Sequence, residues 1–337
     1  MFKQFDLKDY IDSLNKAVTF YLFLFITASI FFGLYLVFFT DIGKDIGWHD
    51  NVPLNFLLLS VFNVSNLYSN LGVAFLFFWF FYAILFIFVV LKPVFLFSGL
   101  GSKKFFNRDL KIFGITNSNF LYIAIQWFSA YFVLSIVIDW VQQLFEISIG
   151  DPLLDNPLLS FFYITAAPLN EEILFRVIFL GVPLSLVLVR YKSSLISTLI
   201  HPGKNVSVES NGIKTIIFLI IFLNSAFFGL SHVVFGGDYG IGKITQATMG
   251  GLFLGWIYYK YGIVTSIVFH WVSNYVLFSY GLVGYYFFNT SLSDETSNYF
   301  LMVLSVAFIV VGIISVYRGA EKTFRFVKNN SGGLNKL

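Results

Sequence analysis

Two adjacent glutamates and an arginine interrupt an apolar stretch in the middle of the sequence. Glu171 and Glu172 are followed four residues later by Arg176. A charge in hydrocarbon costs roughly 2.5–3.5 kcal/mol on insertion scales, so charges in such stretches usually have a function. Glu172 and Arg176 share one face of a helix, where they can neutralise each other. Glu171 points away from this pair and is the candidate to act on a substrate.

Further polar residues occur in two other apolar stretches. His232 follows Phe228 by one helical turn, and His270 and Asn274 are spaced in the same way. A glutamate shielded from water is a candidate general base for taking a proton from water, which His232 could orient. His270 and Asn274 can donate hydrogen bonds to the tetrahedral oxyanion of peptide hydrolysis. With Glu171, these groups indicate hydrolysis by an activated water.

The composition predicts that these residues lie within a membrane. The 337 residues are 58% hydrophobic and 12% charged, whereas soluble domains average roughly 25% charged. We therefore expect an all-α, polytopic bundle of transmembrane helices with a polar intramembrane cavity. The absence of cysteine excludes disulfides, thiolate metal sites and a cysteine nucleophile. A net charge of only +3 indicates no nucleic-acid partner.

About eight apolar segments are predicted to cross the membrane. They are residues 17–39, 71–97, 120–145, 157–190, 213–232, 244–259, 263–280 and 299–317. The fourth is longer than the ~20 residues that one crossing needs, and Pro168 predicts a kink or break ahead of the glutamates. We expect a single transmembrane domain over residues 1–337, with a catalytic core at 157–280 and a basic cytoplasmic tail at 318–337.

The distribution of basic residues predicts the topology. With eight crossings and both termini in the cytoplasm, the cytoplasmic segments hold all but three of the 21 Lys and Arg residues, including the basic loop 103–111. The exceptions are Lys44, Lys243 and the intramembrane Arg176. Cytoplasmic loops of membrane proteins carry such an excess of positive charge. The sequence therefore predicts a multi-pass integral membrane protein in contact with membrane lipids. The side on which the cavity opens is not determined by these spacings.

The polar pairs also form three motifs of a known family. They are EExxxR at Glu171, Glu172 and Arg176, FxxxH at Phe228 and His232, and HxxxN at His270 and Asn274. In this order, over about residues 157–280, they resemble the CPBP (Abi) intramembrane proteases. That family includes type II CAAX prenyl endopeptidases and bacteriocin-processing or immunity proteins. The sequence departs from its usual pattern at Val177, where members often have glycine.

The resemblance implies a role for each motif residue. Glu171 would be the catalytic base and His232 its partner on the water, while Glu172 and Arg176 would support them. His270 and Asn274 would form the oxyanion site. The resemblance also implies a peptide or lipidated protein substrate. The family has been described both as metalloproteases and as metal-free glutamate proteases, so the cofactor is none or zinc; a zinc ion would take Glu171, His232 and His270 as ligands.

Two hypotheses of function follow. The first is an intramembrane endopeptidase that hydrolyses a peptide bond near the membrane surface. The alternative is a non-catalytic membrane protein of the same fold, such as a bacteriocin immunity factor, a scaffold or a transporter. Taken singly, the motifs have structural explanations, as a buried ion pair, a packed histidine or a hydrogen bond between helices. Their joint occurrence favours the enzyme, and the single Pro-interrupted segment disfavours a transporter, which should have broken helices in both halves.

Overall fold

The computed structural model describes most of the chain and is almost wholly helical. The described residues are 7–49, 51–53, 68–98, 120–150, 156–189, 194–204, 210–235, 239–292 and 297–331. The basic loop predicted at 103–111 and the last residues of the predicted tail lie outside them. In the described part, the strands are β1 (Asn51–Pro53) and β2 (Tyr68–Asn70), which pair antiparallel. The expectation of an all-α bundle is confirmed.

The described helices form eight long rods and two short helices, α2 and α8, and two of the rods contain π-helical segments. The elements are α1 (Leu7–Phe38), α2 (Asp41–His49), α4 (Leu71–Ser98), α5 (Phe120–Leu144), α6 (Pro157–Glu171), η2 (Glu172–Gly181), α7 (Val182–Leu188), α8 (Leu195–Ile200), α9 (Asn211–Phe235), α10 (Gly242–Tyr261), α11 (Ile263–Trp271), η3 (Val272–Val276), α12 (Leu277–Phe288) and α13 (Tyr299–Ser331). The π-helices η2 and η3 join α6 to α7 and α11 to α12 without interrupting the helix.

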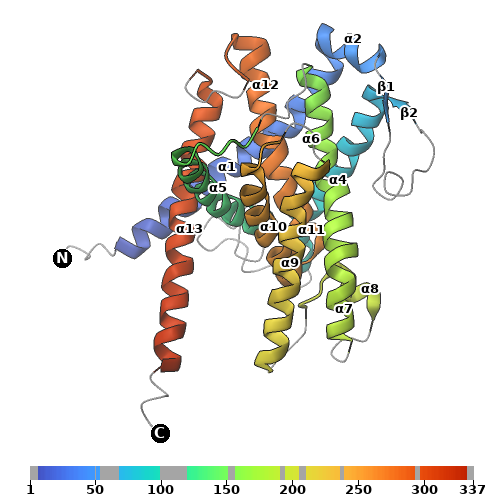
Figure 1. Cartoon of the computed structure of the whole chain (residues 1–337). Coiled ribbons are helices and arrows are strands. Elements are labelled where there is room, and N and C mark those ends of the chain that lie inside the picture. Colours follow the sequence, from blue (N-terminus) through green and yellow to red (C-terminus); the bar gives the residue numbers. More distant parts are fainter. Residues whose placement is uncertain are drawn as a thin grey trace, which may run out of the picture.

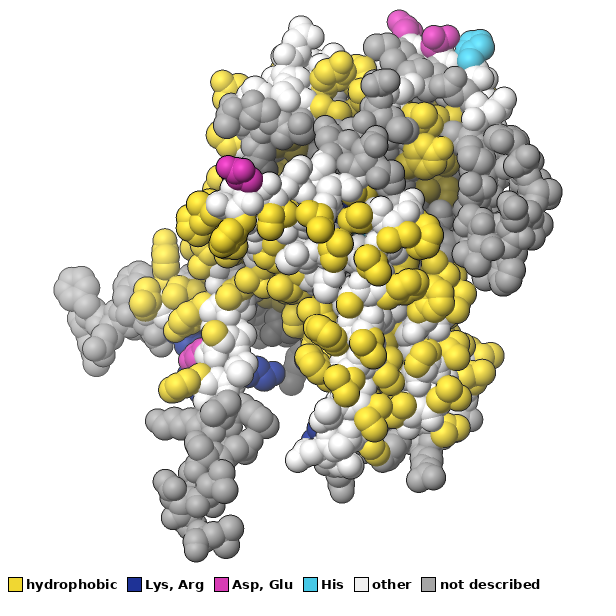
Figure 2. Space-filling model, viewed as in Figure 1, with side chains coloured by type: hydrophobic (Ala, Val, Ile, Leu, Met, Phe, Trp, Pro, Cys, Tyr) yellow, Lys and Arg dark blue, Asp and Glu magenta, His cyan; other side chains and the backbone are white. Residues whose placement is uncertain are grey.

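Six of the described rods are long and apolar enough to cross a membrane. They are Leu7–Phe39, Leu71–Phe88, Phe120–Leu144, Asn211–Phe235, Ile263–Phe288 and Tyr299–Arg325. The other two are α10, which carries four glycines with Lys, Gln and Thr, and the α6–η2–α7 rod, which carries three charges. The chain is thus an integral, multi-pass membrane protein, and the count of eight crossings stays a prediction. Figure 2 shows hydrophobic side chains spread over one face of the bundle, as contact with lipid requires.

Helix α11 lies in the interior of the bundle (Figure 1). It packs against α5, α6, α10 and η2. Every residue from Thr265 to Trp271 is buried, so no face of the second half of α11 is left for lipid. A helix buried on all sides must find partners for any polar group that it carries. The site is built around two such groups, Ser266 and His270.

The beginning of α1 and the later part of α13 lie together. The Arg318 guanidinium donates to the Asp12 carboxylate. Higher in the bundle, the Tyr280 hydroxyl of α12 donates to the Phe25 carbonyl of α1 at 3.0 Å. The ion pair places the two ends of the described chain on the same side of the bundle, as an even number of crossings requires. That this side faces the cytoplasm stays a prediction.

Helix α9 approaches α10 most closely at a glycine. A Cβ atom on Gly229 would lie 2.1 Å from the Thr248 hydroxyl oxygen and 2.6 Å from the Ile244 carbonyl oxygen. Real Cβ atoms do not come so close, so only glycine fits this contact without a shift of the helices. Gly229 is three residues from His232 on the same helix. The close contact therefore fixes the part of α9 that carries a predicted catalytic residue.

We expect Gly229→Ala to lower the stability of the bundle. The added methyl group meets backbone of α10, and overpacking of this kind costs about 1–3 kcal/mol. The apparent Tm in detergent should fall by several degrees. Gly319→Ala is the matched control, because nothing lies within 4 Å of a Cβ at Gly319; it should leave Tm unchanged or raise it slightly. Equal Tm values for the two variants would contradict the close contact.

Candidate active site

The two glutamates lie where the helix changes its hydrogen-bond pattern. The sequence predicted a kink or break at Pro168; helix α6 continues through it to Glu171, so a break is wrong and the kink stays a prediction. The change comes after Glu171, where the π-helix η2 begins. Just before it, the Leu169 N–H donates to the Tyr82 hydroxyl of α4 at 3.0 Å. Single-turn π segments are common at functional sites, because they re-aim side chains without ending the helix.

Glu172 is fully buried and meets two hydrogen-bond donors and one ion-pair partner. Its Oε2 lies 3.3 Å from the Arg176 Nε and accepts a hydrogen bond from the Ser266 hydroxyl. Its Oε1 lies 2.9 Å from the His270 Nδ1. The predicted pairing of Glu172 with Arg176 is present in the structure. Two neighbouring residues of α11, absent from that prediction, complete the set of partners that a buried carboxylate needs.

Arg176 is equally buried, and its guanidinium contacts groups on η2 and α9. The Nη1 donates to Asn224 Oδ1 at 3.2 Å, and Asn224 Nδ2 in turn donates to the Phe175 carbonyl at 3.1 Å. The guanidinium carbon lies 4.6 Å from the centroid of the Phe228 ring, as in a cation–π contact. The aromatic residue of the FxxxH motif thus contacts the arginine of the EExxxR motif.

Glu171 faces the two histidines. Its Oε2 lies 4.0 Å from the Nε2 of His232 and 3.8 Å from the Nε2 of His270. The side chain of Glu171 is 27% exposed, whereas that of Glu172 is 0% exposed. The adjacent glutamates therefore differ: Glu172 is enclosed by fixed partners, whereas the Glu171 side chain is partly exposed and its Oε2 is buried without a hydrogen-bond partner among the described residues. The two separations exceed a direct hydrogen bond and are suited to a bridging oxygen atom.

The partners of the two imidazoles determine which nitrogen carries the proton. His232 Nδ1 lies 2.8 Å from the Phe228 carbonyl oxygen, which can only accept, so Nδ1 is the donor. His270 Nδ1 donates in the same way to Glu172. In the neutral form, each histidine therefore presents the lone pair of Nε2 towards Glu171. Three acceptors converge, and a water molecule between them can donate its two protons to two of them at a time.

Asn274 lies one turn beyond His270, in the π-helix η3. It is half-buried, and its Oδ1 lies 3.1 Å from the Ser273 hydroxyl, which donates its proton to the His270 carbonyl at 2.7 Å. The Nδ2 group is the part of this side chain that can donate to a substrate. The structure thus joins Glu171, His232 and His270 by close approach. It places Asn274 on the same rod as His270, without a contact to Glu171.

The geometry does not fit the predicted zinc alternative. Two ligands on a tetrahedral zinc, each roughly 2.0–2.1 Å away, lie roughly 3.4 Å apart. The separations of 3.8 and 4.0 Å from Glu171 to the histidines are longer. Within the described residues, no group of three or more His, Asp or Glu side chains is arranged to hold a metal ion. Glu171, His232 and His270 therefore lie close together without the spacing of a zinc site.

Three residues that support the site belong to none of the three motifs. Asn224 and Ser266 each belong to a pair of adjacent polar residues in an apolar segment, which signals a buried partner but not its identity. Tyr82 lies among many aromatic residues of α4, and nothing in the sequence separates it from its neighbours. All three act on the glutamate region from distant parts of the chain.

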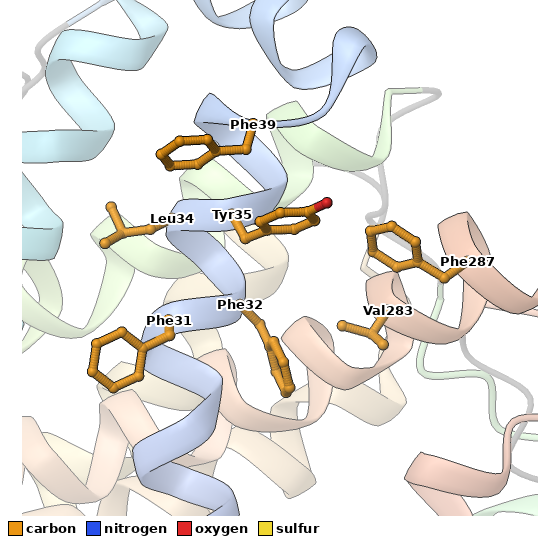
Figure 3. A pocket seen from close by; sticks show the side chains of 7 residues that line it. All are labelled: Phe31, Phe32, Leu34, Tyr35, Phe39, Val283 and Phe287. Atoms are coloured by element: carbon orange, nitrogen blue, oxygen red, sulfur yellow. The ribbon is translucent and has the colours of Figure 1, made fainter.

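An apolar pocket of about 550 Å³ lies away from this site, between α1 and α12 (Figure 3). Its lining side chains are all apolar or aromatic: Phe31, Phe32, Leu34, Tyr35, Phe39, Val283 and Phe287. Figure 3 shows Phe32, Tyr35, Val283 and Phe287 between the two helices, while Phe31, Leu34 and Phe39 extend from the other side of α1. None of the predicted site residues lines it, so it offers no catalytic group.

The arrangement of the three motifs agrees with a comparison to protein families. Residues 153–276 match the family model described as type II CAAX prenyl endopeptidase Rce1-like. Over these residues the chain is similar to the type II CAAX prenyl endopeptidases, which supports the resemblance to the CPBP family of CAAX proteases. The match contains all six predicted site residues and covers less than half of the chain. No curated protein and no solved structure is significantly similar to the chain.

The Rce1-like domain corresponds to definite elements of the fold. It covers the α6–η2–α7 rod, α9, α10, α11 and η3, which together carry the site. The fold is thus that of a CAAX-type intramembrane protease. The match gives no support to the bacteriocin-related members of the resemblance or to a metalloprotease.

We expect Arg176→Gln to destabilise the Rce1-like domain strongly. Removing one partner of a buried ion pair leaves an uncompensated charge and costs roughly 3–5 kcal/mol. The apparent Tm in detergent should fall by roughly 5–10 °C. The double variant Glu172→Gln, Arg176→Gln should lose less than the sum of the two single losses.

The pair between Asp12 and Arg318 is the matched control. Its side chains are 45% and 35% exposed, so Arg318→Gln should cost less than about 1 kcal/mol. Additive losses at Glu172 and Arg176, or a loss at Arg318 as large as that at Arg176, would contradict the role of the buried pair.

Proposed function

We propose that this protein is an intramembrane endopeptidase that hydrolyses a peptide bond with a water activated by Glu171. The matched family, type II CAAX prenyl endopeptidase Rce1-like, indicates CAAX-type, prenylated peptide substrates. The observation that carries the proposal is the convergence of the partly exposed Glu171 side chain with the Nε2 atoms of His232 and His270. A purely structural ion-pair network would not need a partly exposed carboxylate beside a buried, fully paired one.

In the proposed mechanism, Glu171 acts as a general base. A water molecule held between its carboxylate and the two imidazoles gives a proton to Glu171 while its oxygen attacks the scissile carbonyl carbon. The carbonyl π electrons move to the oxygen and form a tetrahedral oxyanion. When this intermediate collapses, the C–N bond breaks and Glu171 returns the proton to the leaving amine. The net reaction consumes one water and one peptide bond, and it gives a carboxylic acid and an amine.

Oxyanion stabilisation is assigned to α11 and η3. Asn274 can donate from its Nδ2 group. His270 already donates its Nδ1 proton to Glu172, so donation from Nε2 to the oxyanion requires the imidazolium form. The predicted oxyanion role of His270 therefore applies only to its protonated form. In the neutral form, His270 or His232 can accept the proton of the water that Glu171 does not take.

Glu171→Gln should abolish hydrolysis while preserving the fold. The amide cannot accept a proton from water, and a general base contributes about 10²–10⁴-fold to the rate. We expect kcat on a prenylated peptide to fall by about that factor, with an unchanged Tm. Glu146→Gln, at an exposed glutamate outside the site, is the control and should retain full activity. Full activity of Glu171→Gln, or no cleavage by the wild-type protein, would refute the proposal.

Removing metal ions should leave the rate unchanged. The proposed mechanism assigns activation of the water to Glu171, because its distances to the histidines do not suit a shared zinc ion. After exhaustive dialysis of the purified protein against a strong chelator, kcat should stay within about twofold of its starting value. A loss of activity that added zinc restores would contradict this part of the mechanism.

A further inference from the structure

A lysine that belongs to none of the three motifs lies beside the site. Lys243 is in the first turn of α10. It is one of the three basic residues that the sequence does not place in cytoplasmic segments. Its Nζ lies 4.7 Å from the centroid of the Tyr239 ring, and that ring lies 5.8 Å from the ring of His232. Its charge also acts on Glu171 and His232. A cation at the start of α10 thus lies near His232 and Glu171.

The contacts of Lys243 are with neutral groups. Its Nζ donates to Gln246 Oε1 at 3.1 Å and lies over the Tyr239 ring. The Gln246 Nε2 donates onward to the Ser135 hydroxyl of α5 at 3.1 Å, which holds the amide in place. An amide oxygen and an aromatic face position an ammonium without neutralising it. The charge of Lys243 therefore stays available to an anion.

The backbone around Lys243 is held firmly but offers no donors of its own. The Gly240 and Gly242 N–H groups donate to the Ile149 and Ser148 carbonyls at 2.8 and 2.9 Å. On the other side, Gln142 Nε2 donates to the Gly242 carbonyl at 2.9 Å. A bound anion would thus depend on the lysine side chain and not on the end of the helix. These contacts fix the position from which the side chain extends.

Electrostatics explains why a cation is needed here. In a low-dielectric cavity, the charge of Glu171 repels any second carboxylate strongly. The charge of Glu172 is compensated by Arg176, but Glu171 meets only histidines at close range in the described structure. A substrate whose chain ends near the scissile bond would bring its terminal carboxylate into this field. Lys243 can offset that repulsion.

We propose that Lys243 binds the C-terminal carboxylate of the substrate and so selects peptides that end shortly after the scissile bond. This inference rests on the proposed function and adds a specificity residue to it. Two side chains lie between Glu171 and Lys243, a separation on the scale of a short leaving peptide. The path from Glu171 through His232 and Tyr239 to Lys243 is made of steps of 4.0, 5.8 and 4.7 Å. An extended peptide covers about 3.3 Å per residue, so a tripeptide spans about 10 Å.

The test uses one prenylated CAAX peptide with a free C-terminal carboxylate and the same peptide as a C-terminal carboxamide. For the wild-type protein, kcat/KM should be about ten times or more higher for the acid, the usual value of a hydrogen bond to a charged group. In Lys243→Gln, the acid-to-amide ratio should fall to about one. Lys243→Arg keeps the charge and should retain most of the preference. A peptide with an internal Asp and an amidated end distinguishes a terminal from a side-chain carboxylate.

Binding measured without turnover separates this inference from the proposed function. Fluorescence anisotropy of the labelled acid and amide peptides on Glu171→Gln should give an acid preference that Lys243→Gln, in the same background, removes. If the wild-type protein cleaves neither peptide, the proposed function fails, while the binding ratio still decides the carboxylate site. Equal affinities for acid and amide, or an acid preference that survives Lys243→Gln, would overturn the assignment of Lys243.

Discussion

The site depends on the burial of the Glu172 and Arg176 charges away from both water and lipid. Neither charge would be tolerated alone, because an unpaired ion in the interior costs several kcal/mol. Each is therefore tied to other helices, Glu172 to Ser266 and His270 of α11, and Arg176 to Asn224 of α9. The need to satisfy two buried charges thus holds η2, α9 and α11 in one arrangement. The reactive groups of these same helices are positioned as a consequence.

The two π-helical segments belong to this arrangement. Helix η2 starts at Glu172, and η3 starts two residues after His270. Each segment carries residues of a motif on a rod that continues in α-helical form on both sides. A π turn rotates the following side chains relative to the preceding ones. Glu171 and Glu172, which are neighbours in sequence, can therefore serve separate sets of partners.

The sequence predicted the members of the site better than their connections. Residues four apart on a helix share a face, so the Glu172–Arg176 pair follows from spacing alone. The approach of His232 and His270 to Glu171 was predicted from the order of the three motifs. The break at Pro168 was wrong, because the Tyr82 hydroxyl of α4 accepts the Leu169 N–H and the helix continues. Contacts such as those of Tyr82, Ser266 and Asn224 join helices distant in the chain, and no local pattern encodes them.

The orientation of the two imidazoles links the buried Glu172–Arg176 pair to the proposed catalysis by Glu171. Since Glu172 is held in place by Arg176 and Ser266, it fixes the proton of His270 on Nδ1; the Phe228 carbonyl does the same for His232. Phe228 also lies against the Arg176 guanidinium. Both lone pairs are thereby directed at Glu171 before any substrate binds, and this preorganisation costs nothing at the moment of reaction. Loss of Arg176 would thus disturb catalysis through the tautomer of His270 as well as through stability.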